Sequence, residues 1–73
     1  MNKTIEIKTP AQAEKINQLA CAAPYEVWLS SGTVMLDARS LLGLLTLVGK
    51  KVRVVAEDDV DPKRFSRLVD KMA

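Results

Sequence analysis

The chain has 73 residues, the length of one small domain, and we expect residues 1–73 to form a single domain. Its 11 basic and 9 acidic residues are interleaved and give a net charge of +2, without the basic stripe of a nucleic-acid-binding protein. One cysteine and no histidine exclude a disulfide framework and remove the commonest metal ligand and general base. No apolar run is long enough for a membrane span and no signal peptide is visible. We therefore expect a cytoplasmic protein without membrane insertion, nucleic-acid partner, metal or other cofactor.

The first elements are a strand and a helix. Residues 4–8 alternate polar and apolar side chains, which predicts a half-buried strand. Thr9 then has the place of a helix N-cap, Pro10 the first helical position, and Gln12 the last position of a capping box. The helix has an alanine-rich apolar face, and it should end before Pro24, because the residue before a proline avoids helical geometry.

The centre of the chain predicts a β-hairpin. Residues 25–30 alternate again and residues 33–36 form the return strand, with Ser31 and Gly32 as the turn. A further alternating stretch at residues 50–57 predicts the fourth strand.

A last amphipathic helix begins at Asp61 and Pro62, which repeat the pattern of cap and proline. The order βαββαβα predicts an α+β fold, in which a four-stranded antiparallel sheet has three helices on one face. On the open face, Trp28, Met35 and Val55 would form a small apolar strip. Ordinary cross-strand packing is the favoured interpretation of this strip, and a partner or self-association surface is the alternative.

The most informative stretch is residues 37–49. Ser40 has the place of an N-cap, and Gly49 ends the short helix predicted at residues 41–48. Six of these positions (41, 42, 44, 45, 47 and 48) are apolar, which is too many for one buried face, so we expect some leucines to face water or a partner. A cap followed by a core helix is one interpretation. A docking site with a phosphorylatable Ser40 beside the Arg39 cation is the other.

The element order, the hairpin and above all the run Asp37-Ala38-Arg39-Ser40-Leu41-Leu42-Gly43-Leu44-Leu45-Thr46-Leu47 resemble the histidine-containing phosphocarrier protein (HPr) family of the bacterial sugar phosphotransferase system. The resemblance covers nearly the whole chain. It implies the HPr-like open-faced β-sandwich with βαββαβα order.

The chain departs from the family pattern at the phosphoryl-carrying histidine. The family has that histidine in a Gly-Ile-His-Ala-Arg-Pro-Ala motif at the start of the first helix. Counting back from Ser40 puts the histidine at about Thr9 and the motif's arginine at about Ala11, so both are absent here. A phosphothreonine is a low-energy ester, whereas phosphohistidine is a labile phosphoramidate. We therefore interpret Thr9 as a helix cap and expect a divergent member that cannot carry phosphate on histidine.

The regulatory site of the family does have matching residues. Ser40 matches the serine phosphorylated by the ATP-dependent HPr kinase/phosphorylase, and Arg39 matches the cation before it. Leu41, Leu42 and Leu45 match exposed apolar positions that contact enzyme partners and, in the phosphorylated form, the catabolite control repressor. The resemblance thus implies phosphotransferase-system proteins or the kinase as partners. The alternatives are a retained cap in a scaffold that has lost its partners, or an HPr-derived interaction module outside that system.

A small enzyme is the least favoured interpretation. Asp58, Asp59 and Asp61 lie close together in sequence, but such runs are usually solvated loop charge with a helix cap. Their spacing lacks the calcium-loop pattern, and no nucleophile–base pair or phosphate-binding glycine loop is visible. We therefore predict that the chain is not an enzyme.

Overall fold

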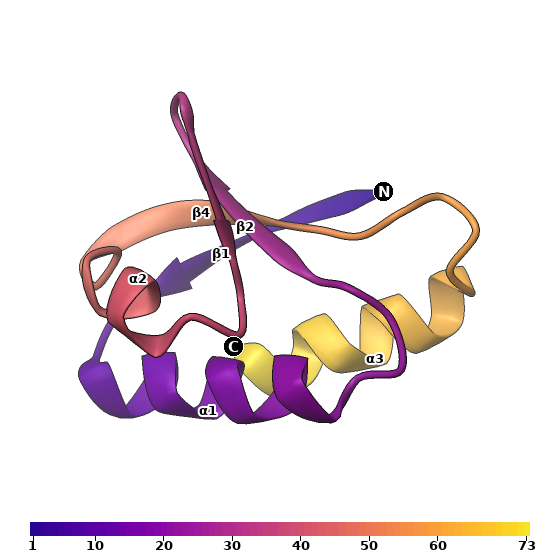
Figure 1. Ribbon diagram of the computed structural model, residues 1–73, viewed down its shortest axis with the longest axis horizontal. Helices are drawn as coiled ribbons and strands as arrows, with labels where there is room; N and C mark the ends of the chain where they lie inside the picture. The colour runs from indigo at the N-terminus through magenta and orange to yellow at the C-terminus, as the bar shows by residue number, and fades with distance from the viewer.

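The computed structural model describes all of residues 1–73 and has the predicted order βαββαβα (Figure 1). Its elements are β1 (Asn2–Ile7), α1 (Pro10–Ala22), β2 (Trp28–Ser31), β3 (Val34–Asp37), α2 (Leu41–Leu45), β4 (Lys50–Val55) and α3 (Pro62–Met72). None of the three helices is long and apolar enough to cross a bilayer.

The four strands form one antiparallel sheet, as the sequence predicts. The order of the strands is β1-β4-β2-β3, so β1 and β3 are its edges. Figure 1 shows α1 and α3 side by side beneath this sheet, with α2 above the N-terminal half of α1. The helices therefore cover one face and leave the other open. On the open face Trp28 lies opposite Val55, and both are half-buried, as expected for cross-strand packing.

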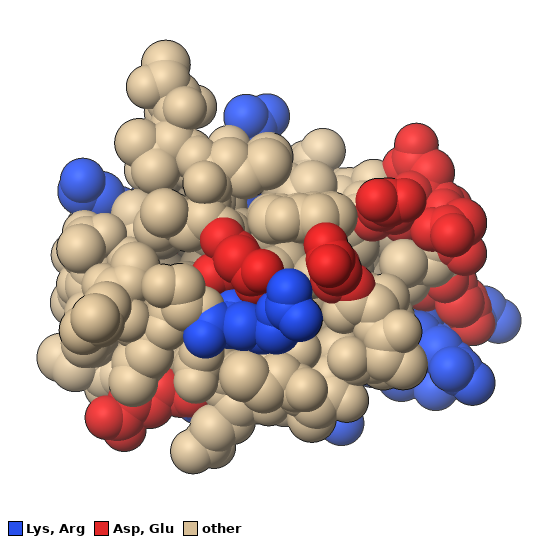
Figure 2. Space-filling view, in the orientation of Figure 1, with Lys and Arg blue, Asp and Glu red and all other residues tan.

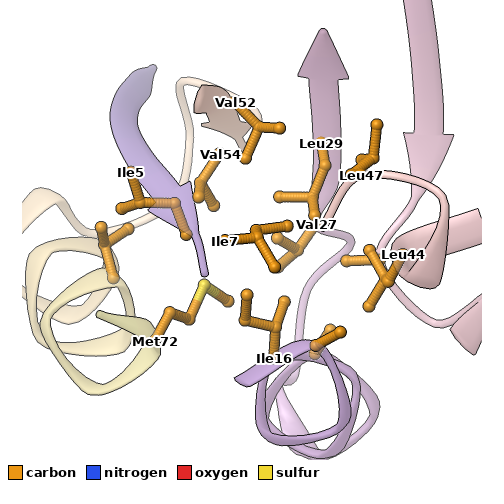
Figure 3. Packing of buried hydrophobic residues seen from close by; sticks show 14 of the residues in the cluster. Ile5, Ile7, Ile16, Val27, Leu29, Leu44, Leu47, Val52, Val54 and Met72 are labelled. Carbon is orange, nitrogen blue, oxygen red and sulfur yellow. The ribbon is translucent and has the colours of Figure 1, made fainter. Parts of the chain in front are cut away.

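The core lies between the sheet and the helices. Alternate residues of the strands point toward the helices, because side chains of a strand alternate between its two faces. Figure 3 shows the core side chains directed toward one another from all the layers. The labelled members are Ile5, Ile7, Val27, Leu29, Val52 and Val54 from the strands and the residue before β2, Ile16 from α1, Leu44 and Leu47 from α2 and the turn after it, and Met72 from α3.

All three helix starts are confirmed at the predicted caps. The Thr9, Ser40 and Asp61 side chains each accept a hydrogen bond from a backbone N–H in the first turn of the following helix. The capping box differs from the prediction in one respect. The Gln12 Oε1 accepts from the N–H of Lys8 at 2.8 Å instead of that of Thr9. Its Nε2 donates to the carbonyls of Glu6 and Met72, which holds the amide toward the end of β1.

Several predicted boundaries were wrong by a few residues. The strand predicted at residues 25–30 begins only at Trp28, because pairing with β4 stops where Trp28 meets Val55. The hairpin turn is Gly32-Thr33 instead of Ser31-Gly32, since Ser31 pairs with Val34. This two-residue loop has a positive φ of 58° at Gly32, a conformation that glycine adopts without steric cost.

The helix predicted at residues 41–48 ends at Leu45. The N–H groups of Thr46 and Leu47 donate to carbonyls only three residues back, which tightens the chain into a turn. Gly49 then has a φ of 88°, and its N–H donates to the carbonyl of Ile7 at 2.6 Å. This bond ties the end of the turn after α2 to β1.

Candidate functional site

Ser40 is exposed at the start of α2 on a firmly held connection. Its Oγ accepts from the N–H of Gly43 at 3.4 Å, a long hydrogen bond. Two residues earlier, Ala38 is fully buried, and its N–H donates to the carbonyl of Val27 at 3.0 Å. The Asn17 side chain on α1 donates to the Ala38 carbonyl at 3.3 Å. The serine hydroxyl is therefore accessible on a backbone that α1 and the residue before β2 hold in place.

Gly43 allows α2 to lie close to β3. A Cβ at this position would approach the Leu36 side chain and the Ser40 Oγ at 3.3 Å each, tighter than most contacts of real Cβ atoms. Gly43 has no role among the features predicted from the sequence. Its signal was a glycine inside a short helical run, where an alanine would favour helix more strongly.

The Arg39 guanidinium contacts two carboxylates, those of Asp37 and Glu26. Its Nε and Nη2 donate to the Asp37 carboxylate at 3.2 and 2.8 Å, and Nη2 lies 3.6 Å from Glu26 Oε1. The hydrogen bonds from the Arg39 side chain and backbone lower the pKa of the Asp37 carboxyl from 3.8 to about 2. The cation before Ser40 is thus present at the surface, but its guanidinium faces Asp37 and Glu26.

The apolar run after Ser40 divides into anchoring and accessible leucines. Leu44 and Leu47 are buried in the core. Leu42 is 80% exposed and Leu45 39% exposed, whereas Leu41 is half-buried. We call Leu41, Leu42 and Leu45 the α2 apolar surface. Leu45 follows Leu41 by four positions and Leu42 by three, so the three side chains share one face of α2, which begins next to the exposed Ser40.

Thr9 is exposed at the start of α1, and its Oγ1 accepts from the N–H of Gln12 at 3.1 Å. Figure 1 shows that the start of α1 and α2 lie at the same end of the molecule. Thr9 and Ser40, which the resemblance matches to the family's histidine and regulatory serine, therefore lie at the same end of the fold. The group at the first of them is an alcohol in a helix cap.

Two acidic residues of the loop after β4 have separate partners. Asp58 Oδ1 lies 2.6 Å from the amino group of Met1, and this hydrogen bond lowers the pKa of the Asp58 carboxyl. Asp61 Oδ1 accepts from the N–H of Lys63 at 3.0 Å as the cap of α3. Asp59 is exposed. Asp58 and Asp61 thus serve local structure, and the three carboxylates do not form a group that could hold a metal ion.

Two solved structures are similar to this chain over nearly its whole length. HPr-C-His from Thermoanaerobacter tengcongensis is 26% identical with a TM-score of 0.76, and the match covers 99% of this chain and 90% of that one. A phosphocarrier protein HPr from Bacillus anthracis str. Ames is 14% identical with a TM-score of 0.73, over 97% of this chain and 94% of that one. No protein-family model and no curated protein matches the chain. The chain has the fold of the HPr phosphocarriers, an α+β open-faced sandwich, and it fits an HPr-like family member.

Proposed function

We propose that the chain is an HPr-like regulatory or partner-binding protein related to the phosphoenolpyruvate-dependent sugar phosphotransferase system, and that it binds partners without carrying phosphate on histidine. HPr phosphocarriers work with the proteins of that system and are not themselves enzymes. The observation that carries the proposal is the combination of an HPr-like fold over 99% of the chain with a sequence that contains no histidine.

The start of α1 supports the loss of phosphoryl transfer. Thr9, at the position of the family histidine, uses its hydroxyl oxygen as the cap of α1. A phosphate ester on that oxygen would not pass its phosphoryl group onward as a phosphoramidate does. The accompanying arginine is replaced by the neutral Ala11, so a cation at that position of the helix is also missing.

Phosphorylation of Ser40 is the regulatory step that we propose. The Ser40 residue is exposed, and its hydroxyl oxygen accepts one hydrogen bond, 3.4 Å long, from the N–H of Gly43. Phosphorylation would therefore disturb only this long bond. A phosphate would add a charge of about −1.5 to −2 with strong acceptor oxygens beside the first turn of α2. Arg39 would have to exchange one of its acidic partners, Asp37 or Glu26, to reach it.

The α2 apolar surface is the proposed contact with phosphotransferase-system proteins or with the kinase. Leu42 and Leu45 offer apolar area to a partner without unfolding anything, because Leu44 and Leu47 already hold the stretch on the core. A phosphate on Ser40 would place charge at the edge of this surface. It would change which partners bind and leave the fold in place.

The first experiment is incubation with purified HPr kinase/phosphorylase and ATP, followed by mass spectrometry, with an HPr of the family labelled in parallel. We expect one phosphate on the wild-type chain and none on Ser40→Ala. Ser31→Ala, which removes a half-buried hydroxyl in the hairpin, is the matched control and should be labelled like the wild type. No label on the wild-type chain while HPr is labelled would eliminate the kinase as a partner.

The second experiment tests phosphoryl transfer directly. Enzyme I phosphorylated from phosphoenolpyruvate is mixed with the chain, and label on the chain is measured beside HPr. We expect no transferable label. If the chain accepted the phosphoryl group and passed it to a sugar-specific acceptor, the proposal would be wrong. Binding to neither enzyme I nor the kinase, while HPr binds both, would favour an HPr-derived interaction module outside the system.

A further inference from the structure

A second surface feature lies away from α2, where α3 faces the connection between α1 and β2. A cavity of about 230 Å³ opens there to solvent. We call it the α3 groove. Its principal walls are Arg64, Arg67, Leu68 and Lys71 from α3, and Pro24 and Tyr25 from the connection. Because the groove lies at the C-terminal end of α1 and α2 lies above the N-terminal half, the two surfaces are at different ends of the molecule (Figure 1).

The charged side chains that line the groove are all cations. Arg64, Arg67 and Lys71 follow one another at i, i+3 and i+7, which puts them on one face of α3 over about 10 Å. All three side chains are exposed, and none forms an ion pair, since the ion pairs of the chain involve only the Met1 amine and Arg39.

Acidic groups border the groove at one end only. Asp59 and Asp61 share a neighbouring hollow with Tyr25 and Arg64, so they face the first cation of the row. Figure 2 shows acidic and basic side chains meeting at this end of the molecule. Asp70 lies on α3 but does not line the groove. Arg67 and Lys71 lie farther along α3, and no acidic side chain is among the residues that line the groove there.

The groove also has apolar walls. Leu68 and Tyr25 are half-buried, and Pro24 lies beside them. The partial burial of Tyr25 raises the pKa of its hydroxyl. Cationic side chains thus lie beside the apolar walls of the α3 groove. This arrangement suits an acidic ligand with an apolar side chain better than it suits a bare anion.

We propose that the α3 groove is a docking site for an acidic segment of a partner protein, in which glutamates or aspartates flank an apolar anchor. Charge complementarity selects this occupant, because three cations, none of them in an ion pair, span two helical turns, more than one phosphate or carboxylate can contact. The α2 apolar surface is not used, so this site does not depend on the proposed phosphotransferase role. A partner bound in the groove would leave Ser40 and α2 free.

The experiment is an NMR titration of the isotopically labelled full chain at low ionic strength. The probe is a synthetic peptide of repeated Glu-Glu-Leu. We expect shift changes confined to residues 23–25 and 64–71, and an affinity that falls steeply with salt. Changes centred on α2, or none at all, would overturn the proposal. A peptide with serine in place of leucine should bind several-fold more weakly, and equal binding would contradict an apolar contact.

Charge-reversed variants test the groove itself. The triple variant R64E/R67E/K71E should lose at least about tenfold in affinity, a change of about 1.4 kcal/mol. The control K3E/K15E/K50E reverses three exposed cations on β1, α1 and β4 and should keep most of the binding. An equal loss of peptide affinity in both variants would show that the peptide is attracted only by the net charge of the chain, and it would overturn the proposal. If tripolyphosphate bound as tightly as the peptide, the groove would be a simple anion site and the proposal of a peptide site would be wrong. Circular dichroism and unchanged peptide-free spectra outside the groove establish that each variant is folded.

Discussion

Replacing Leu44 by alanine should test whether α2 is held on the core by one side chain while its neighbours remain free to bind. Leu44 is fully buried, whereas Leu42, two positions earlier on the same five-residue helix, is 80% exposed. The two substitutions remove the same atoms from the same helix. Their difference therefore isolates burial from helix propensity.

The expected magnitudes follow from those exposures. A buried leucine cut to alanine loses its transfer free energy and leaves a cavity, for about 2–5 kcal/mol. An exposed leucine cut to alanine should change stability by no more than about 0.5 kcal/mol. A chain of 73 residues has a free energy of unfolding of about 4–11 kcal/mol. A central loss of about 3 kcal/mol at Leu44 would thus lower Tm by about 12–24 °C.

The assay is urea and thermal unfolding followed by circular dichroism and by the fluorescence of Trp28, the single tryptophan of the chain. Leu44→Ala should move the midpoint strongly, and Leu42→Ala should leave it near that of the wild type. At temperatures where both variants are folded, Leu42→Ala should weaken partner binding more than Leu44→Ala does. Equal destabilisation by the two substitutions would refute the division of this run into anchoring and accessible leucines.

Three further perturbations have defined outcomes. In an NMR titration the Asp37 carboxyl should show a pKa of about 2, and Arg39→Ala should return it toward 3.8. Because folding depresses this pKa, the stabilisation by the pair is present above pH 3.8 and is lost as the pH falls through about 2, and salt should weaken it. Thr9→Ala should lower the free energy of unfolding by about 1 kcal/mol through loss of the cap of α1, and an unchanged urea midpoint would contradict that cap. Gly49→Ala should cost about 1–2 kcal/mol, because alanine at a φ of 88° is strained although no atom crowds it; a stabilised variant would contradict this backbone conformation.

The sequence predicts best those features that depend on a few adjacent residues. The caps at Thr9, Ser40 and Asp61 each require only a side-chain oxygen and an N–H two or three residues later. The inward positions of the strands follow from alternation alone. These local rules, taken together, are enough for the order of elements and for the layered α+β fold.

The remaining features depend on contacts between distant residues. The turn after α2 is tied to β1 by the bond from Gly49 to the carbonyl of Ile7, which no rule of helix periodicity includes. Glu26 joins the Arg39 pair only because the residues before β2 lie beside the end of β3. The α3 groove likewise needs α3 to lie against the connection after α1. In each case the partner is far away in sequence, so a pattern within one stretch cannot show it.

The backbone hydrogen bonds of Ala38 have a consequence for the binding of a partner at α2. Hydrogen bonds to both its N–H and its carbonyl fix the connection before Ser40 during folding, so that segment has little freedom left to lose. A protein that docks on α2 would meet a ready-made surface and would forfeit little entropy in ordering it. Association there should proceed much as between rigid bodies, with affinity governed by how fast the complex separates.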